Sequence, residues 1–294
     1  MPGKYINPYT DFGFKRIFGQ EAHKDILIAF LNSLLPERHQ IAGLRFRNTE
    51  MTPARAKIYV PTLDLYCESP SGERFIVEMQ QKNQLFFMDR SVFYAACAIR
   101  EQYELGQQDY RLAAVYFVGI MDFVYRIEGS EPELVKEVSL KDRRGFEMYD
   151  KLRMYFLQMP LFTKAEGELA TPFDKWLYFL KNLPGLDHIP AVLGEPVFEK
   201  AFRIAEFARM TADEEWAYFR ACDALRDSKT LVVNARAEGL AEGKAEGLAE
   251  GRAEGIAKEK QETARKMKSL GMTVGNIAAV TGLPEEQINT ALGM

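Results

Sequence analysis

Apolar positions in the first half of the chain alternate between helical and extended spacing. Residues 11–35 carry apolar side chains every third or fourth position, which predicts a helical stretch that stops at the following proline. Residues 41–80 have the pattern of strands, and residues 86–106 return to helical spacing and close on a glycine. Residues 111–121 form a continuous apolar run, as expected of a strand buried on both faces. This order predicts a mixed α/β sandwich.

The strand-like stretch contains a hairpin. Two extended segments, 58–68 and 74–80, flank a Ser-Pro-Ser-Gly sequence, which is a strong turn signal. A turn centred on Ser71 places Asp64 directly opposite Glu78. Carboxylates about 5 Å apart repel each other, so this pairing predicts a cation between them.

The residues next to Glu78 extend this polar patch. Side chains alternate along a strand, so Glu78 and Gln80 share one face, whereas Val77 and Met79 point to the other. Together with Asp64, this alternation predicts two carboxylates and an amide on one patch, backed by an apolar surface.

The pattern after residue 130 predicts further elements without a reactive constellation. Residues 148–162 have the composition of a strand, and residues 173–184 and 197–225 have helical spacing. Trp176 and Trp216 fit core or helix-packing positions better than a platform for a ligand.

Residues 237–256 repeat a four-residue unit, AEGL-AEGK-AEGL-AEGR-AEGI. A four-residue period nearly matches the helical period, so the glycines form a stripe that drifts about 40° per repeat. Each interior glycine costs roughly 1 kcal/mol relative to alanine, so this helix is not expected to be stable alone. Either the stripe lets helices of different copies approach closely, which predicts a homo-oligomer, or the segment is a solvated, partly helical linker.

The last segment has the pattern of a helix-turn-helix. A helix over 273–281, a Gly-Leu turn and a second helix beginning at Pro284 fit that motif. The second helix carries two glutamates and no Lys or Arg, which argues against base reading by it. We expect a packing or assembly module here.

These patterns divide the chain into four parts. They are a core at 1–130, a mostly helical α/β extension at 131–230, the repeat helix or linker at 231–260, and the helix-turn-helix-like module at 261–294.

Composition narrows the class of protein. At 294 residues and 47% hydrophobic residues, the chain can bury a real core. The net charge of −4 argues against a general polyanion binder, but residues 1–100 hold 13 Lys and Arg against 10 Asp and Glu, so nucleic acid is permitted. There is no signal-peptide pattern, no run approaches about 18 apolar residues, and the three cysteines stand far apart. We therefore expect a cytoplasmic protein with reduced thiols and no membrane partner.

Four segments together resemble a known family. They are TDFGFKRIFG near the N-terminus, VEMQ at the hairpin, MDRSVFYAACAIREQY after it, and the AEG repeats of the tail. With the pattern Asp64–x13–Glu78–x–Gln80, they resemble the PD-(D/E)XK nuclease superfamily and, within it, the Rpn family of recombination-promoting nucleases, also described as PD-(D/E)XK nuclease family transposases. The resemblance covers nearly the whole chain. It implies a restriction-endonuclease-like mixed sheet flanked by helices, with a helical C-terminal extension.

The resemblance also implies an activity: metal-dependent hydrolysis of DNA, with a role in recombination or mobile-element biology. It places Asp64 and Glu78 as carboxylate ligands of Mg²⁺, with the Met79 carbonyl completing the protein's share, and Mn²⁺ is the second candidate ion. The ion would activate a water for attack on the scissile phosphate and neutralise the charge that grows there.

Gln80 stands where the superfamily usually has lysine. An amide can orient the attacking water, but it offers no positive charge and cannot accept a proton as a neutral lysine can. Lys82 could replace the missing lysine if the end of the strand curls back. The departure keeps a second hypothesis open, in which a catalytically degenerate nuclease fold serves as a DNA-binding or assembly module.

Five residues of the helical segments are further candidates. Asp11 could supply another carboxylate, although it also fits the N-cap of its helix. Lys15 and Arg16 could contact phosphate or be merely solvated. Arg90 and Tyr94 lie one helical turn apart and resemble the family's R-x-x-x-Y pattern, so they could line the DNA cleft or serve a structural role.

Overall fold

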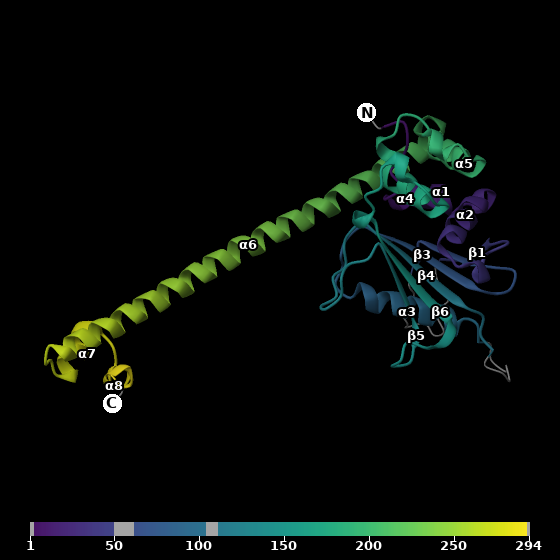
Figure 1. The fold of residues 1–294 in the computed structure, drawn as a ribbon. Helices are drawn as coiled ribbons and strands as arrows, with labels where there is room; N and C mark the ends of the chain where they lie inside the picture. The colour runs from purple at the N-terminus through teal and green to yellow at the C-terminus, as the bar shows by residue number, and fades with distance from the viewer. Residues whose placement is uncertain (1–2, 50–61, 104–110, 293–294) are drawn as a thin grey trace, which may run out of the picture. The chain divides into compact units, whose positions relative to one another are not determined.

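A six-stranded mixed sheet organises the N-terminal part of the chain (Figure 1). The strand order is β1-β2-β3-β4-β6-β5, in which β3 is parallel to β4, β4 is parallel to β6, and the other neighbours are antiparallel. The strands are β1 (Arg45–Phe46), β2 (Leu65–Glu68), β3 (Arg74–Gln80), β4 (Val115–Met121), β5 (Val135–Lys141) and β6 (Glu147–Gln158).

The structure, a computed structural model, describes residues 3–49, 62–103 and 111–292. The chain divides into two units, Met1–Leu225 and Arg226–Met294. The helices are α1 (Asp11–Phe18), α2 (Lys24–Leu34), α3 (Phe87–Arg100), α4 (Pro172–Asn182), α5 (Pro196–Ala205), α6 (Ala212–Ser269), α7 (Val274–Thr281) and α8 (Glu285–Leu292). No helix among these described ranges combines the length and apolar character needed to span a membrane.

Helices cover both faces of the sheet, as the α/β prediction requires. Helix α3 packs against one face, and α1, α2, α4 and α5 pack together on the other (Figure 1). The strands supply both layers because their side chains alternate. In β3, Phe75 and Val77 enter the larger core, while Ile76 enters the core beneath α3. Glu78 and Gln80 have the same parity as Ile76 and therefore face α3.

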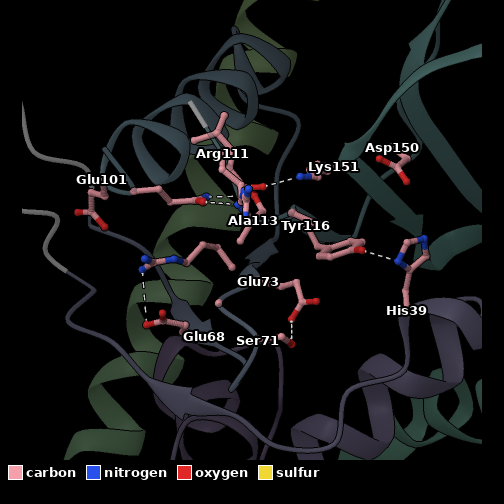
Figure 2. A pocket seen from close by; sticks show the side chains of 15 residues that line it. His39, Glu68, Ser71, Glu73, Glu101, Arg111, Ala113, Tyr116, Asp150 and Lys151 are labelled. Atoms are coloured by element: carbon pink, nitrogen blue, oxygen red, sulfur yellow. Dashed lines mark hydrogen bonds and ion pairs between the residues drawn. The ribbon is translucent and has the colours of Figure 1, made fainter. Parts of the chain in front are cut away.

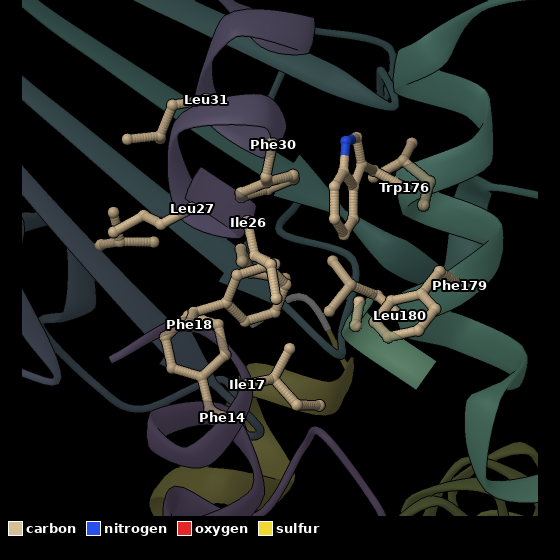
Figure 3. Packing of buried hydrophobic residues seen from close by; sticks show 14 of the residues in the cluster. Phe14, Ile17, Phe18, Ile26, Leu27, Phe30, Leu31, Trp176, Phe179 and Leu180 are labelled. Carbon is tan, nitrogen blue, oxygen red and sulfur yellow. The ribbon is translucent and has the colours of Figure 1, made fainter. Parts of the chain in front are cut away.

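Aromatic and aliphatic side chains pack together in the larger core (Figure 3). Trp176 is 1% exposed, and its ring lies 5.9 Å from Phe18 and 6.1 Å from Phe30, which confirms it as a core residue. Trp216 was expected to be a core or packing residue as well, but it is 64% exposed and stacks only on the Arg220 guanidinium among the ring contacts described. Trp216 lies on the exposed side of α6, and other residues occupy the partly buried side of the same turn.

The helical stretch predicted over residues 11–35 is two helices. Helix α1 ends at Gly19, whose backbone N–H closes on the Lys15 carbonyl at 2.8 Å. A Cβ atom at Gly19 would lie 2.8 Å from the Leu65 side chain, so glycine permits the close approach of this turn to β2. The chain then changes direction before α2.

The helix after the hairpin is shorter than its spacing predicts. It ends at Arg100 instead of at residue 106, which lies outside the described residues. Two residues later, the Gln102 side chain accepts from the Ala113 N–H at 2.7 Å and donates to the Ala113 carbonyl at 3.3 Å. These bonds join the end of α3 to the approach to β4.

The second half of the first unit completes the sheet of the first half. The expected boundary at residue 130 does not separate two bodies, because β6 lies between β4 and β5 and pairs with β4 along seven residues. The strand predicted at 148–162 is β6. The pattern did not predict β5, because this edge strand is largely exposed and its charged residues mask its alternation.

The helix expected over residues 197–225 is interrupted between α5 and α6. The interruption has a tertiary cause. The Ile6 N–H donates to the Ala205 carbonyl, and the Phe207 N–H donates to the Lys4 carbonyl, each at 2.9 Å. The backbone leaves the helix here to pair with the N-terminal segment.

The second unit contains the predicted repeat and helix-turn-helix. The repeat is helical within α6, and residues 231–259 are exposed. Helix α7 ends at Gly282, with φ of +67°, and α8 follows, as the sequence predicts. Ala264, Ile277 and Ile288 form its small core.

Candidate metal and nucleic-acid site

Asp64 and Glu78 lie side by side at one end of the hairpin. Leu65 pairs with Val77 in the antiparallel ladder, so Asp64, the residue before β2, falls opposite Glu78, which confirms the predicted register. The Asp64 backbone N–H donates to Glu78 Oε1 at 3.0 Å, and the Met79 N–H donates to Asp64 Oδ2 at 2.8 Å. The backbone beside each carboxylate therefore orients the other carboxylate. Residues 58–61 of the predicted strand lie outside the described residues.

Burial makes this carboxylate pair costly to ionise. Glu78 is 6% exposed, and burial together with the charge of Asp64 raises its pKa to about 8. Burial is also the largest reason that the pKa of Asp64 is raised, and the hydrogen bond from Met79 opposes it. The charges of Lys15 and Arg90 lower both pKa values. A cation between the carboxylates would relieve the repulsion, so the chemistry of the donors fits a metal.

The Met79 carbonyl lies on the same side of β3 as Asp64. The Gln80 carbonyl accepts from the Asp122 N–H at 2.9 Å, so the peptide groups of Gln80 face β4. Peptide groups alternate sides along a strand, and the Met79 N–H already points to Asp64, so its C=O does too. The result is a donor set of oxygens, which suits Mg²⁺.

Side chains alone do not complete a metal shell. Over residues 3–49, 62–103 and 111–292, no three His, Cys, Asp or Glu side chains are grouped to hold a metal. A metal held by Asp64 and Glu78 would therefore take its remaining ligands from the backbone and water, as Mg²⁺ commonly does.

Arg90 from α3 brings a positive charge to Gln80. Its guanidinium donates to Gln80 Oε1 and, at 2.6 Å, to Gln84 Oε1. The Gln80 amide in turn donates to the Lys82 carbonyl at 3.3 Å. The strand position that lacks a lysine is thus in contact with a cation supplied by a helix.

Tyr94 supports Arg90 from the next turn of α3. The Arg90 guanidinium lies 5.8 Å from the centre of the Tyr94 ring and 5.5 Å from that of Phe87. Tyr94 is 5% exposed, so it forms part of the wall under the arginine and offers little surface to a ligand. The predicted common face of residues 90 and 94 is confirmed.

The start of α1 also lies near the carboxylates. Asp11 forms an ion pair with Lys15 at 2.7 Å; the Asp11 side chain is largely exposed and the Lys15 side chain is partly exposed. The charge of Asp11 adds to burial in raising the pKa of Asp64. The N-cap is Thr10, whose hydroxyl accepts from the Gly13 N–H at 3.0 Å, so the capping role considered for Asp11 belongs to its neighbour.

Arg16 and Lys82, which were predicted to contact DNA, have other partners within the fold. The Arg16 guanidinium pairs with Glu214 and donates to the Ile204 carbonyl at 3.0 Å, so it joins α1 to α5 and α6. Lys82 is half-buried, and its link to the site runs through its backbone carbonyl.

Two glutamines belong to the site although the sequence analysis did not single them out. The Gln81 side chain donates to the Tyr9 carbonyl and so fastens the start of α1 to the end of β3. Gln84 orients Arg90. The only local signal was the polar run QQKNQ after the strand, which resembles an ordinary loop.

A separate cavity of about 590 Å³ opens at the other end of β3 (Figure 2). Its lining mixes acids and bases, including Glu73, Arg74 and Lys151, and Tyr116 donates to or accepts from His39 Nδ1 at 2.7 Å in its wall. Because Arg74 is the first residue of β3 and Gln80 the last, this cavity is distinct from the carboxylate pair.

The fold and the site together define a class: a mixed sheet between helices that presents paired acids at the end of a central hairpin. The chain belongs to the PD-(D/E)XK nuclease family transposases, whose family model matches residues 8–235. The match covers the whole sheet and all helices that contribute to the site. No curated protein and no solved structure gives a match.

Proposed function

We propose that this protein is a Mg²⁺-dependent DNA endonuclease that hydrolyses phosphodiester bonds at the Asp64–Glu78 pair. The observation that carries the proposal is the buried, backbone-oriented pair of carboxylates with Arg90 beside it. Membership of a nuclease family supports the reaction class.

Asp64, Glu78 and the Met79 carbonyl would hold the ion, and Mn²⁺ would be accepted in the same place. When bound, the ion supplies positive charge that favours ionisation of water and stabilises the phosphate in the transition state. The Asp64 and Met79 N–H groups keep the two carboxylates in position without further rearrangement.

Gln80 and Arg90 would act as a unit. The Gln80 amide orients the attacking water, and Arg90 both fixes this amide and supplies the charge that the usual lysine would provide. A guanidinium offers only hydrogen-bond donors and no acceptor, so proton transfer falls to water or substrate.

Lys15 and Arg90 would contact the DNA backbone, with Lys82 at the edge and Tyr94 supporting the arginine. Asp11 would tune the carboxylate pair or contribute a water-mediated contact to the ion. Arg16 is excluded from this group because Glu214 engages it.

Three further features support the proposed biological setting. A role in DNA recombination or mobile elements follows from the transposase family. Three free thiols suit the cytoplasm. The exposed glycine repeat supports a homo-oligomer joined through the C-terminal segment.

Plasmid cleavage with Mg²⁺ tests the reaction. Asp64→Ala and Glu78→Ala should each reduce nicking at least about 100-fold, whereas Asp150→Ala, which removes an exposed acid from β6, should not. Cleavage that survives in both site variants rules out this site.

The second candidate, a degenerate fold that binds DNA without cutting it, is motivated by Gln80 in the lysine position. Calorimetry separates the two functions, since a degenerate site should show no Mg²⁺ or Mn²⁺ binding that depends on Asp64.

A further inference from the structure

The loop between β3 and α3 exposes two large apolar side chains in succession. Leu85 is 83% exposed and Phe86 is 69% exposed. We call this pair the Leu85–Phe86 tip. Neither side chain belongs to a core cluster, although Phe86 directly precedes Phe87, which is 2% exposed.

The backbone of the tip is strained. Phe86 has φ of +65° and is the only non-glycine residue with positive φ among the residues that the structure describes. A bulky residue is disfavoured in this left-handed region. Since most of its ring remains in solvent, burial within this chain does not offset the strain.

The tip is held beside the carboxylate site by Arg90. The Phe86 carbonyl accepts from the Arg90 N–H at 3.0 Å, while the Arg90 guanidinium reaches Gln84 at 2.6 Å and also contacts Gln80. One residue therefore fixes both the backbone of the tip and the amide of the site.

A second exposed aromatic ring lies on α3, near Arg90. Phe93 is 41% exposed and follows Arg90 by three residues, so these two side chains are neighbours on α3. Along the chain, Arg90 thus stands between two exposed aromatic side chains, Phe86 in the loop and Phe93 on the helix.

Aromatic rings interleaved with cations are the composition of surfaces on which nucleic-acid bases stack. We propose that Phe86, with Leu85, packs against a base that is unstacked next to the scissile phosphate, so that the preferred substrate is DNA with unpaired or distorted bases. This inference rests on the proposed function and specifies its substrate.

The occupant follows from the surroundings of the tip. A base attached to a phosphate near Asp64 and Glu78 has to lie close by, because Gln80 and the tip are joined through the same arginine. An apolar surface of a second copy would gain nothing from the guanidinium, whereas a base offers a π face to it. Apolar side chains that enter a duplex in this way unstack neighbouring base pairs.

Binding of the full-length chain in EDTA tests the proposal without cleavage. The probes are two fluorescein-labelled duplexes of identical sequence, one fully paired and one with a central unpaired bulge, measured by anisotropy. We expect the wild type to bind the bulged duplex about tenfold more tightly, and Phe86→Ala to lose that preference while its affinity for the paired duplex changes less than about twofold.

Two further variants exclude simpler explanations. Phe86→Gly suits the positive φ, so it should fold at least as well as the wild type and still lose the preference. Phe146→Ala removes a ring that is 67% exposed at the far end of the sheet, and it should retain the preference.

The outcomes separate this inference from the proposed function. A wild type that binds neither duplex overturns the inference, while the proposed function is decided separately by plasmid cleavage with Mg²⁺. A wild type that binds DNA without preference, or a Phe86→Ala variant that keeps the preference, overturns only the inference. Light scattering that shows loss of self-association in Phe86→Ala, with unchanged DNA binding, would assign the tip to a second copy and also overturn it.

Discussion

Asp64 and Glu78 are oriented reciprocally: the backbone N–H of Asp64 donates to Glu78 Oε1, while the N–H that follows Glu78 donates to Asp64 Oδ2. Two buried acids are thereby held together although their charges repel. Burial and the charge of Asp64 raise the pKa of Glu78 to about 8, and burial also raises the pKa of Asp64, so the pair favours retention of a proton when no cation is bound.

The first prediction concerns the pH dependence of stability without metal. The pKa of Glu78 in the folded protein is about 8, above its ordinary value of 4.5, so the folded state holds a proton that the unfolded chain has released between these values. Stability should therefore fall as pH rises through this window, by up to about 1.4 kcal/mol per pH unit. Glu78→Gln cannot ionise and should gain at least about 2 kcal/mol relative to the wild type between pH 5 and pH 8.

Urea denaturation in EDTA measures this difference. Glu73→Gln is the matched control, since the pKa of Glu73 is lowered by the Ser69 and Ser71 hydroxyls, which outweigh the effect of burial. The stability that ionised Glu73 contributes is complete above its ordinary pKa. The difference in the free energy of unfolding between Glu73→Gln and the wild type should therefore stay constant from pH 5 to pH 8. Parallel stability curves for Glu78→Gln and the wild type would show that Glu78 is ionised throughout.

The second prediction is that Mg²⁺ stabilises the protein through the same pair. At a concentration about 100-fold above its Kd, the ion should add about 2.7 kcal/mol, or roughly 5–10 °C in Tm for a domain of this size. Asp64→Asn removes one charged ligand and should abolish most of the shift. Differential scanning fluorimetry provides the measurement, with Asp150→Asn as the control in an exposed acid. An equal shift in Asp64→Asn would place the ion elsewhere.

The third prediction concerns Arg90. Its planar guanidinium contacts two glutamine side chains at once, which a lysine ammonium cannot reproduce in the same geometry. Arg90→Ala should lower kcat about 100-fold, and Arg90→Lys should recover only part of the loss. Arg90→Ala should also bind Mg²⁺ more weakly at neutral pH, because the Arg90 charge lowers the pKa of Asp64 and of Glu78, whereas Arg90→Lys keeps a positive charge there.

Steady-state cleavage at saturating Mg²⁺ distinguishes the role of Arg90. A change confined to KM would make Arg90 a DNA-binding residue without influence on Gln80. Arg100→Ala, at the exposed other end of α3, should leave both constants near those of the wild type.

The fourth prediction concerns the glycine repeat. The repeat glycines of α6 have nothing within 4 Å of an added Cβ atom, so within one chain alanine fits at each of them. If the stripe joins copies, the double variant Gly243→Ala, Gly247→Ala should stabilise the helix by about 1 kcal/mol per site and yet reduce association. A chain truncated after residue 235 retains the residues that match the family and should form a smaller oligomer.

Sedimentation analysis reads out the result. An unchanged oligomeric state in the truncated chain would leave the repeat as a solvated helix. The alanine variants then should only become more helical by circular dichroism.

Local patterns in the sequence predicted the hairpin well. Its turn signal sets the register, and the register alone places Asp64 opposite Glu78. The buried run of β4 and the helix-turn-helix of the tail were equally predictable, since each depends on neighbouring residues. In contrast, the breaks after Gly19 and Ala205 escaped the pattern because their causes are contacts with β2 and with the N-terminal segment.

The order of the amino acids is enough to place two acids and an amide on one face of a strand, because the two-residue period of a strand requires it. The residues that meet this face come from the packing of the folded chain. This packing brought Arg90 to Gln80, placed Lys15 within electrostatic reach of the carboxylates and assigned Arg16 to Glu214. These contacts arise because helices pack on the two faces of the sheet. The residues that they join are not spaced by a helix or strand period, so the sequence pattern does not reveal them.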